Sequence, residues 1–166
     1  YLSNTIDDFQ TYFHPKKEIS RVEIVGLLRK SVSFVAPRLK GANIKIAIDA
    51  DSEIILNTYE NELVQVMLNL INNAIDALAS NDGENPNILI SAREKNDRAT
   101  IIVKDNGSGI SEENLPFIFD PYFSTKGKNG TGLGLYMSQM IAQKQFDGDI
   151  SVQSSKKWNP IRTRDS

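Results

Sequence analysis

The chain has 166 residues, of which 40% are hydrophobic and 24% charged, and its formal net charge is −2. This length allows one globular core, and the near-neutral charge argues against a nucleic-acid or anionic membrane surface. The absence of cysteine excludes disulfides and thiolate chemistry, the single histidine (His14) excludes a zinc cluster, and no apolar run could span a membrane. We therefore expect a cytoplasmic domain.

Residues 1–15 are the first predicted element, an amphipathic helix followed by a joint at Pro15. The apolar positions recur every three to four residues, as in one face of a helix. They are Leu2, Ile6, Phe9 and Phe13. This apolar stripe either packs on a partner helix or folds back on its own domain.

A second helix is predicted from Ser20 to the region of Gly41. Ser20 and Glu23 match the S-x-x-E capping box, and apolar residues repeat at helical spacing after them. Pro37 is expected to bend or loosen the final turn. Gly41 is placed as the glycine that follows the helix C-terminus.

Two short strands are predicted next. Ile44, Ile46 and Ile48 alternate with other residues, which indicates a half-buried strand over 43–49. A second strand at 53–56 is expected to pair with the first as a hairpin. We interpret both strands as scaffold.

The helix predicted over 60–80 carries a polar stripe opposite its apolar face. The stripe consists of Glu62, Gln65, Asn69, Asn73 and Asp76. Asparagine is a poor helix former, so its repetition in mid-helix is unusual, although composition alone also fits an ordinary solvated face. Asn69 and Asn73 are four residues apart, so both amides can point at one Mg²⁺ ion or its water shell.

Two further strands are predicted over 88–94 and 99–104, joined by a turn at 96–97. The second ends in a glycine-containing loop, "DNGSGI", over 105–110. Glycine allows the backbone to approach a flat ligand closely, and the Asp105 carboxylate can accept a hydrogen bond from an exocyclic amine such as that of adenine. Alone, this loop also fits a calcium loop or a plain turn.

Aromatic residues crowd positions 117–123 and predict a small satellite core that anchors a flexible lid over 124–132. Lys126 in the lid is expected to reach phosphate oxygens, whereas Lys128 is assigned to solubility. The glycine cluster "GTGLGL" at 130–135 leads into a helix, and the backbone N–H groups at a helix N-terminus form an anion site.

Neither common phosphate-binding fingerprint fits, because the Walker A sequence is absent and no βαβ unit surrounds these glycines. In their order, the motifs resemble those of the catalytic ATP-binding domain of sensor histidine kinases. The wider superfamily includes type II topoisomerases, the mismatch-repair ATPase and the Hsp90 chaperone. The matching boxes are "NLINNAIDA" (N box), "DNGSGI" (first glycine box), "FIFDPYFSTK" (F box) and "GTGLGL" (second glycine box).

The resemblance implies roles for the matching positions. Asp105 would bind the adenine amino group of ATP, Asn73 would coordinate Mg²⁺, and Asn69 would support it. Lys126 would contact the phosphates, so Asn69, Asn73 and Lys126 are the candidate catalytic residues. The other positions implied to contact the nucleotide are Gly107, Gly109, Ile110, Phe119, Thr131, Gly132, Leu133 and Gly134.

The implied fold is an α/β (α+β) two-layer sandwich of the Bergerat type. It has a mixed, mostly antiparallel sheet of about five strands, covered on one face by about three helices. Residues 1–15 would be the end of a dimerisation helix with its linker, and residues 16–155 the catalytic domain. Residues 156–166 do not resemble the family pattern, so we expect an atypical, truncated or foreign tail that leaves a sheet edge unpaired.

The resemblance implies a protein-histidine kinase that transfers the ATP γ-phosphoryl to a histidine on a separate dimerisation domain, for relay to a response-regulator aspartate. The parent would be a homodimer, either cytoplasmic or anchored in the inner membrane. His14 lacks the acceptor context of the family, so this chain would need that separate domain. The alternatives are a non-catalytic, nucleotide-gated interaction module and an ATPase of the same superfamily.

Two departures bear on the chemistry. ATP-hydrolysing members resemble one another in placing Glu where this chain has Asn69, and an amide cannot accept the proton of an attacking water. Asn69 therefore favours a kinase over an ATPase. Many family members have Lys or Arg where this chain has Asp76, so phosphate neutralisation is expected to rest on Lys126 and Mg²⁺.

Overall fold

The computed structural model describes residues 18–79, 85–96, 98–107, 113–117, 119–120, 139–140, 142, 149–152 and 161–165. The helix predicted in 1–15, the lid and the second glycine box lie outside these residues. Within them, no helix combines the length and the apolar character that crossing a membrane requires.

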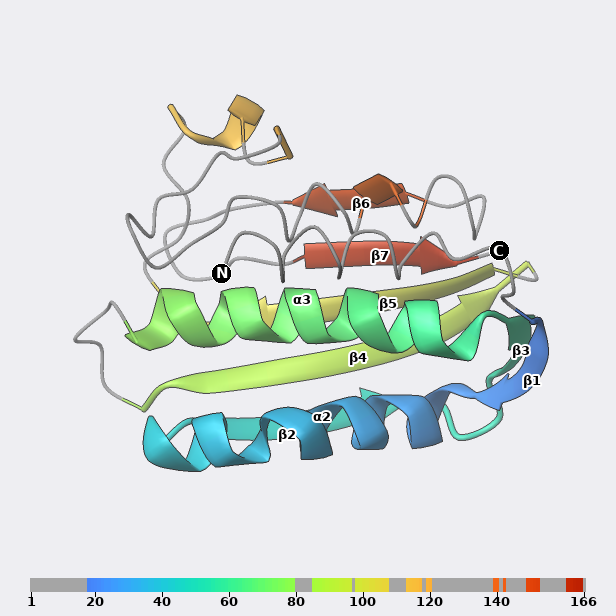
Figure 1. The fold of residues 1–166 in the computed structure, drawn as a ribbon, viewed down its shortest axis with the longest axis horizontal. Helices are drawn as coiled ribbons and strands as arrows, with labels where there is room; N and C mark the ends of the chain where they lie inside the picture. The colour runs from blue at the N-terminus through green and yellow to red at the C-terminus, as the bar shows by residue number, and fades with distance from the viewer. Residues whose placement is uncertain are drawn as a thin grey trace.

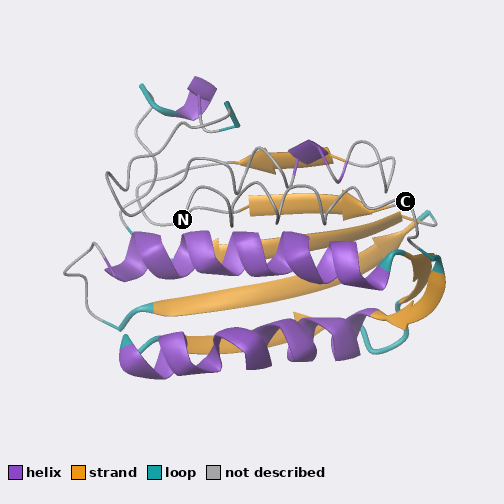
Figure 2. Cartoon of the chain, in the orientation of Figure 1, coloured by secondary structure: helices purple, strands orange, loops and turns teal. Residues whose placement is uncertain are grey.

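The fold is a two-layer sandwich in which helices cover one face of a five-stranded sheet (Figures 1 and 2). The strand order is β2-β4-β5-β7-β6, with β2 and β4 parallel and the other neighbouring pairs antiparallel. The strands are β2 (Lys45–Ala50), β4 (Asn87–Lys95), β5 (Arg98–Asp105), β6 (Asp149–Val152) and β7 (Ile161–Asp165). This arrangement confirms the predicted fold class.

Two long helices, α2 (Ile24–Gly41) and α3 (Glu60–Ala79), lie side by side over the sheet and run in the same direction (Figure 1). The long helix predicted over 60–80 is thereby confirmed as α3. The helix predicted after the second glycine box falls mostly outside the described residues.

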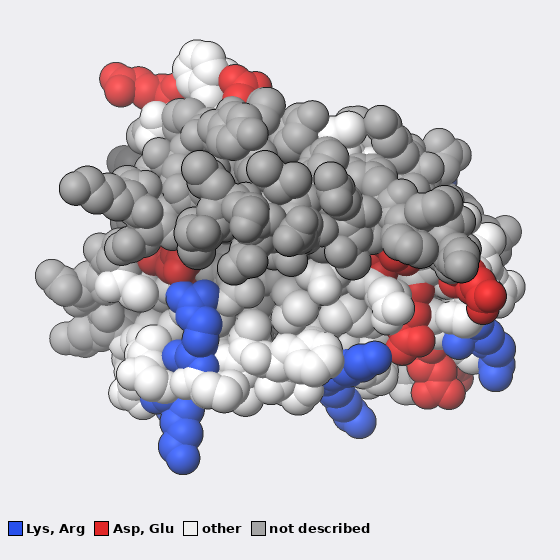
Figure 3. All heavy atoms as spheres, viewed as in Figure 1, with Lys and Arg blue, Asp and Glu red and all other residues white. Residues whose placement is uncertain are grey.

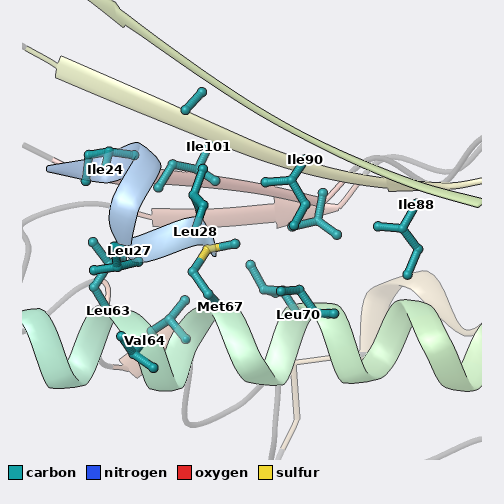
Figure 4. Close-up of a cluster of buried hydrophobic side chains, with 14 of the residues drawn as sticks. Ile24, Leu27, Leu28, Leu63, Val64, Met67, Leu70, Ile88, Ile90 and Ile101 are labelled. Carbon is teal, nitrogen blue, oxygen red and sulfur yellow. The ribbon is translucent and has the colours of Figure 1, made fainter. Parts of the chain in front are cut away.

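The hydrophobic core fills the space between the two helices and the sheet, as Figure 4 shows. Met67 and Leu70 of α3 and Leu28 of α2 point toward Ile90 of β4 and Ile101 of β5, and all five side chains are 0% exposed. Burial of one such side chain stabilises a fold by about 1.5–3 kcal/mol. The core therefore fixes the position of α3 relative to the ends of β4 and β5.

Buried and less buried residues alternate along β4 and β5. Ile88 and Ile90 are at most 1% exposed, whereas Leu89 between them is partly exposed. The antiparallel register places Ile90 opposite Val103. The turn that joins the strands includes Asn96, whose φ of 54° lies in the left-handed region that asparagine tolerates. The predicted pair of strands is confirmed.

The predicted hairpin between 43–49 and 53–56 is wrong. β2 pairs in parallel with β4, which places Ile46 beside Ile88. β3 (Ile55–Thr58) instead pairs with β1 (Ser20–Glu23) in a separate two-stranded sheet. The physical reason is that the apolar residues of β2 lie beside those of β4 and pack under α2. The hairpin prediction considered only neighbouring segments of the chain.

The predicted capping box at Ser20 and Glu23 is also wrong. Both residues belong to β1, and α2 begins only at Ile24. Glu23 precedes the helix in an extended conformation and makes no side-chain cap hydrogen bond. Val22 pairs with Leu56 of β3 and both are buried, so tertiary pairing overrides the local capping preference.

The end of α2 differs from the prediction by one residue. The helix continues through Pro37 to Gly41, so Gly41 is its last residue rather than the one that follows it. Ala42 caps the helix, and its N–H donates to the Arg38 carbonyl at 3.0 Å. The left-handed conformation falls on Asn43, with a φ of 58°.

The prediction that residues 156–166 leave a sheet edge unpaired is wrong for the described part of that segment. β7 lies inside the sheet, antiparallel to β5 on one side and to β6 on the other. Position 162 is opposite Ile102 of β5 and Ser151 of β6. Backbone hydrogen bonds to both neighbouring strands therefore stabilise β7, although its sequence does not show the pattern typical of a strand.

Candidate functional site

The apolar face of α3 is buried in the core, and this fixes the direction of its polar stripe. Partly exposed residues on the other side of the helix are Gln65, Asn69, Asn72, Asn73 and Asp76. Asn69 and Asn73 are one helical turn apart on this stripe, as predicted from their spacing. Glu62 departs from the prediction, because it is only 8% exposed.

Asp105, the last residue of β5, carries a buried carboxylate beside α3. Asp105 is 2% exposed, and its Oδ1 accepts a hydrogen bond from the Gly107 N–H at 2.8 Å. A Cβ added to Gly107 would lie 2.9 Å from Asp105 Oδ1 and 3.4 Å from the Ala77 carbonyl oxygen. Glycine is therefore needed at this position, because the loop passes too close to the carboxylate and to α3 for a side chain.

The first glycine loop meets the C-terminal part of the asparagine-bearing helix α3 at this contact. Ala77 is one helical turn beyond Asn73, and its carbonyl is the α3 atom that Gly107 approaches. The fold thus brings Asp105 and Gly107 against the helix that carries the two asparagines, which are more than thirty residues away in the sequence. The observed contact is between the loop after β5 and the α3 backbone at Ala77.

Asn106 fixes the loop from its other side. Its Oδ1 accepts a hydrogen bond from the Asn87 N–H at 2.9 Å, and its Nδ2 donates to the Asn85 carbonyl at 2.9 Å. These two bonds tie the residue after β5 to the beginning of β4. This role of Asn106 is not predictable from the sequence, because nothing local shows that an asparagine side chain will span to another strand.

Phe119 is partly buried and packs against the main core. Phe117 ends the short helix η1 (Leu115–Phe117) and is 50% exposed. Of the predicted aromatic satellite core, only these two residues belong to the described part. The other predicted site residues, Gly109, Ile110, Lys126, Thr131, Gly132, Leu133 and Gly134, lie outside the described residues.

Arg38, in the last turn of α2, joins the polar stripe although no local pattern singles it out. Its Nη1 donates to Asn72 Oδ1 at 2.6 Å and its Nη2 to Asp76 Oδ1 at 2.8 Å. Figure 3 shows basic and acidic side chains meeting where the C-terminal ends of α2 and α3 lie side by side. The role of this cation is not visible in the sequence, because its partners are 34 and 38 residues away.

The donor set of the site fits Mg²⁺ better than a metal that needs a closed protein cage. No cluster of three or more His, Cys, Asp or Glu side chains able to hold a metal occurs in the described ranges. Asn69 and Asn73 offer hard, neutral amide oxygens instead. Mg²⁺ keeps several waters and usually takes one or two protein ligands together with substrate phosphates.

Comparison with known proteins shows the family of this chain. The family model described as "Histidine kinase-, DNA gyrase B-, and HSP90-like ATPase" matches residues 58–163. A curated relative, the probable C4-dicarboxylate sensor kinase of Halalkalibacterium halodurans, is 36% identical over 141 residues, which cover 83% of this chain and 26% of that protein. The chain thus spans about a quarter of the length of this relative.

Solved structures give the same answer for the fold. The catalytic domain of histidine kinase ThkA has a TM-score of 0.79 and 25% identity, covering 89% of this chain and 95% of that one. Full-length ShkA in complex with AMPPNP has a TM-score of 0.83 and 23% identity, covering 99% of this chain and 35% of that one.

Proposed function

We propose a function from the family of this chain, which belongs to the histidine kinase-, DNA gyrase B- and HSP90-like ATPases. The chain is proposed to be the ATP-binding catalytic domain of a sensor histidine kinase. The observation that carries the proposal is the contact between the asparagine helix α3 and the buried Asp105–Gly107 loop. The sensor-kinase relative and the likeness to the ThkA catalytic domain support this branch of the family.

The base end of the site would be formed by Asp105 and the first glycine loop. Asp105 would accept a hydrogen bond from the adenine amino group, and the Gly107 N–H holds one carboxylate oxygen in a defined position. The absence of a side chain at Gly107 would leave room for the base. Gly109, Ile110 and Phe119 are proposed to complete this end.

The phosphate end would be formed by α3 and the second glycine box. Asn73 would supply an amide oxygen to Mg²⁺, with Asn69 one turn away supporting it. When bound, Mg²⁺ would neutralise negative charge on the phosphates. Lys126 is proposed to contact the phosphates, together with Thr131, Gly132, Leu133 and Gly134.

The neutral amide of Asn69 favours transfer of the phosphoryl group over its hydrolysis. An asparagine cannot take a proton from water as a carboxylate can. The site would therefore hold the γ-phosphoryl for a nucleophile from elsewhere, which we propose is a histidine on a separate dimerisation domain. A response-regulator aspartate would then receive the phosphoryl group, and the parent kinase would act as a homodimer.

The proposal is tested by supplying the chain with a dimerisation domain that carries an acceptor histidine, together with γ-labelled ATP and Mg²⁺. We expect acid-labile phosphate to appear on that domain. Asn73→Ala should abolish the labelling, whereas Asn61→Ala, an exposed asparagine on the same helix, should not. Normal labelling by Asn73→Ala would refute the assignment.

Steady-state hydrolysis separates the kinase from an ATPase of the same family. We expect slow release of phosphate by the isolated chain. Fast release that is lost in Asn69→Ala would identify an ATPase. ATP binding without any labelling of the supplied domain would identify a nucleotide-gated interaction module.

A further inference from the structure

Arg38 makes a two-pronged contact with the polar stripe of α3. Its two terminal nitrogens bind different side chains, Asn72 at 2.6 Å and Asp76 at 2.8 Å. The side chain of Arg38 is 47% exposed and that of Asp76 is 31% exposed, so the ion pair lies at the surface. Exposed ion pairs contribute little to folding stability. The contact of Arg38 can therefore matter more for the charge of the polar stripe than for the stability of the fold.

Asp76 is an unfavourable residue for a site that binds a polyphosphate. It lies three residues beyond Asn73 on the same partly exposed stripe, and residues at this spacing are neighbours on a helix surface. A bare carboxylate beside the proposed magnesium ligand would repel the phosphates of ATP. The structure places the guanidinium of Arg38 directly on this carboxylate.

We propose that Arg38 is a positioning residue that neutralises Asp76 and holds it, with Asn72, on the α2 side of the stripe. The charge beside Asn69 and Asn73 is thereby balanced without a cation on α3 itself. This inference rests on the proposed binding of Mg·ATP. It adds a residue from α2 to a site otherwise formed by α3 and the loops.

The molecule offers a matched control for this role. Lys30 of α2 and Glu60 of α3 form a second ion pair between the same two helices, at 3.7 Å, with side chains 46% and 44% exposed. Glu60 is the first residue of α3, four helical turns before Asp76. Lys30→Ala therefore removes an interhelical ion pair of similar exposure that lies away from the proposed phosphate end.

The experiment compares the wild-type chain with Arg38→Ala, Asp76→Asn, the Arg38→Ala/Asp76→Asn double variant and Lys30→Ala. Binding of the fluorescent nucleotide TNP-ATP is measured with MgCl₂ at low and high salt, and thermal unfolding is recorded for each protein. An uncompensated unit charge close to a multiply charged ligand is expected to change its affinity about three- to tenfold at low salt. Arg38→Ala should show a loss of this size.

The double variant is the decisive measurement. Because Asp76→Asn removes the repelling charge, it should restore the affinity of Arg38→Ala to within about twofold of wild type, although it cannot restore the ion pair. The loss in Arg38→Ala should also shrink near 1 M salt, where the Debye length is about 3 Å. Lys30→Ala should bind nucleotide like the wild type.

Three results would overturn the inference. Unchanged affinity of Arg38→Ala, with normal binding by the wild type, would remove the role of Arg38 and leave the proposed function intact. Equal losses in Arg38→Ala and in the double variant would show a purely structural contact. Failure of the wild-type chain to bind the nucleotide would instead refute the proposed function, and this inference with it.

Discussion

Replacing Gly107 with alanine should weaken both the fold and the adenine end of the proposed site. The added Cβ would lie 2.9 Å from Asp105 Oδ1, a distance that real Cβ atoms essentially never show, and 3.4 Å from the Ala77 carbonyl. Asp105 is 2% exposed, so its carboxylate has little room to move away. Either the carboxylate or the loop must shift, and both are joined by the Gly107 N–H bond.

The size of the effect follows from these contacts. Overpacking a tight interior site costs about 1–3 kcal/mol, and weakening a hydrogen bond to a charged group costs about 1.5–3 kcal/mol. A shift of the carboxylate relieves part of the overpacking but weakens the hydrogen bond, so the two costs do not add in full. We therefore expect the free energy of unfolding to fall by about 2 kcal/mol. A displaced Asp105 should lower ATP affinity about tenfold or more, since about 1.4 kcal/mol corresponds to a factor of ten.

Urea unfolding and nucleotide titration measure these two effects, and Gly26→Ala is the control. A Cβ at Gly26, inside α2, meets nothing within 4 Å, so this variant should gain up to about 1 kcal/mol from helix propensity. Wild-type stability together with wild-type ATP affinity in Gly107→Ala would refute the argument that this loop has no space for a side chain.

Three further substitutions test the framework of the site. Asn106→Ala removes two hydrogen bonds and should destabilise the fold by about 1–3 kcal/mol. Hydrogen exchange at the Asn87 amide should become faster, and unchanged exchange would contradict the role of Asn106 in joining the loop to β4. Met67→Ala, at a side chain 0% exposed, should lose about 2–5 kcal/mol in urea unfolding, and a loss below 1 kcal/mol would contradict its central place in the core. Ser31→Ala removes a bond to the Leu27 carbonyl within α2 and should change stability by less than about 1 kcal/mol, as thermal unfolding can check.

Sequence reasoning succeeded where local pattern and final burial agree. Ile44, Ile46 and Ile48 alternate with other residues in the sequence, and in the structure each of them is less exposed than its neighbours. The spacing of Asn69 and Asn73 placed them on one face of α3, opposite its apolar residues. In both cases one periodicity determined the element and its orientation at once.

The errors share a cause, which is competition from partners far away in the sequence. The capping box at Ser20 and Glu23 was a correct local signal that lost to pairing between β1 and β3. The hairpin after α2 failed because β2 found β4, a strand about forty residues later. Arg38 was missed for the same reason, since only the packing of α2 on α3 places it beside Asp76.

The position of β7 in the sheet means that β5 is synthesised well before one of its two neighbouring strands. β5 is complete at residue 105, but its neighbour in the sheet is formed by residues 161–165. Until those residues have left the ribosome, β5 has an open hydrogen-bonding edge along the apolar run Ile101 to Val103. Lys104 directly follows that run and Arg98 precedes it by three residues, and charged residues near an apolar strand discourage aggregation. We therefore expect these charged residues to reduce aggregation through the edge of β5 until β7 has been synthesised.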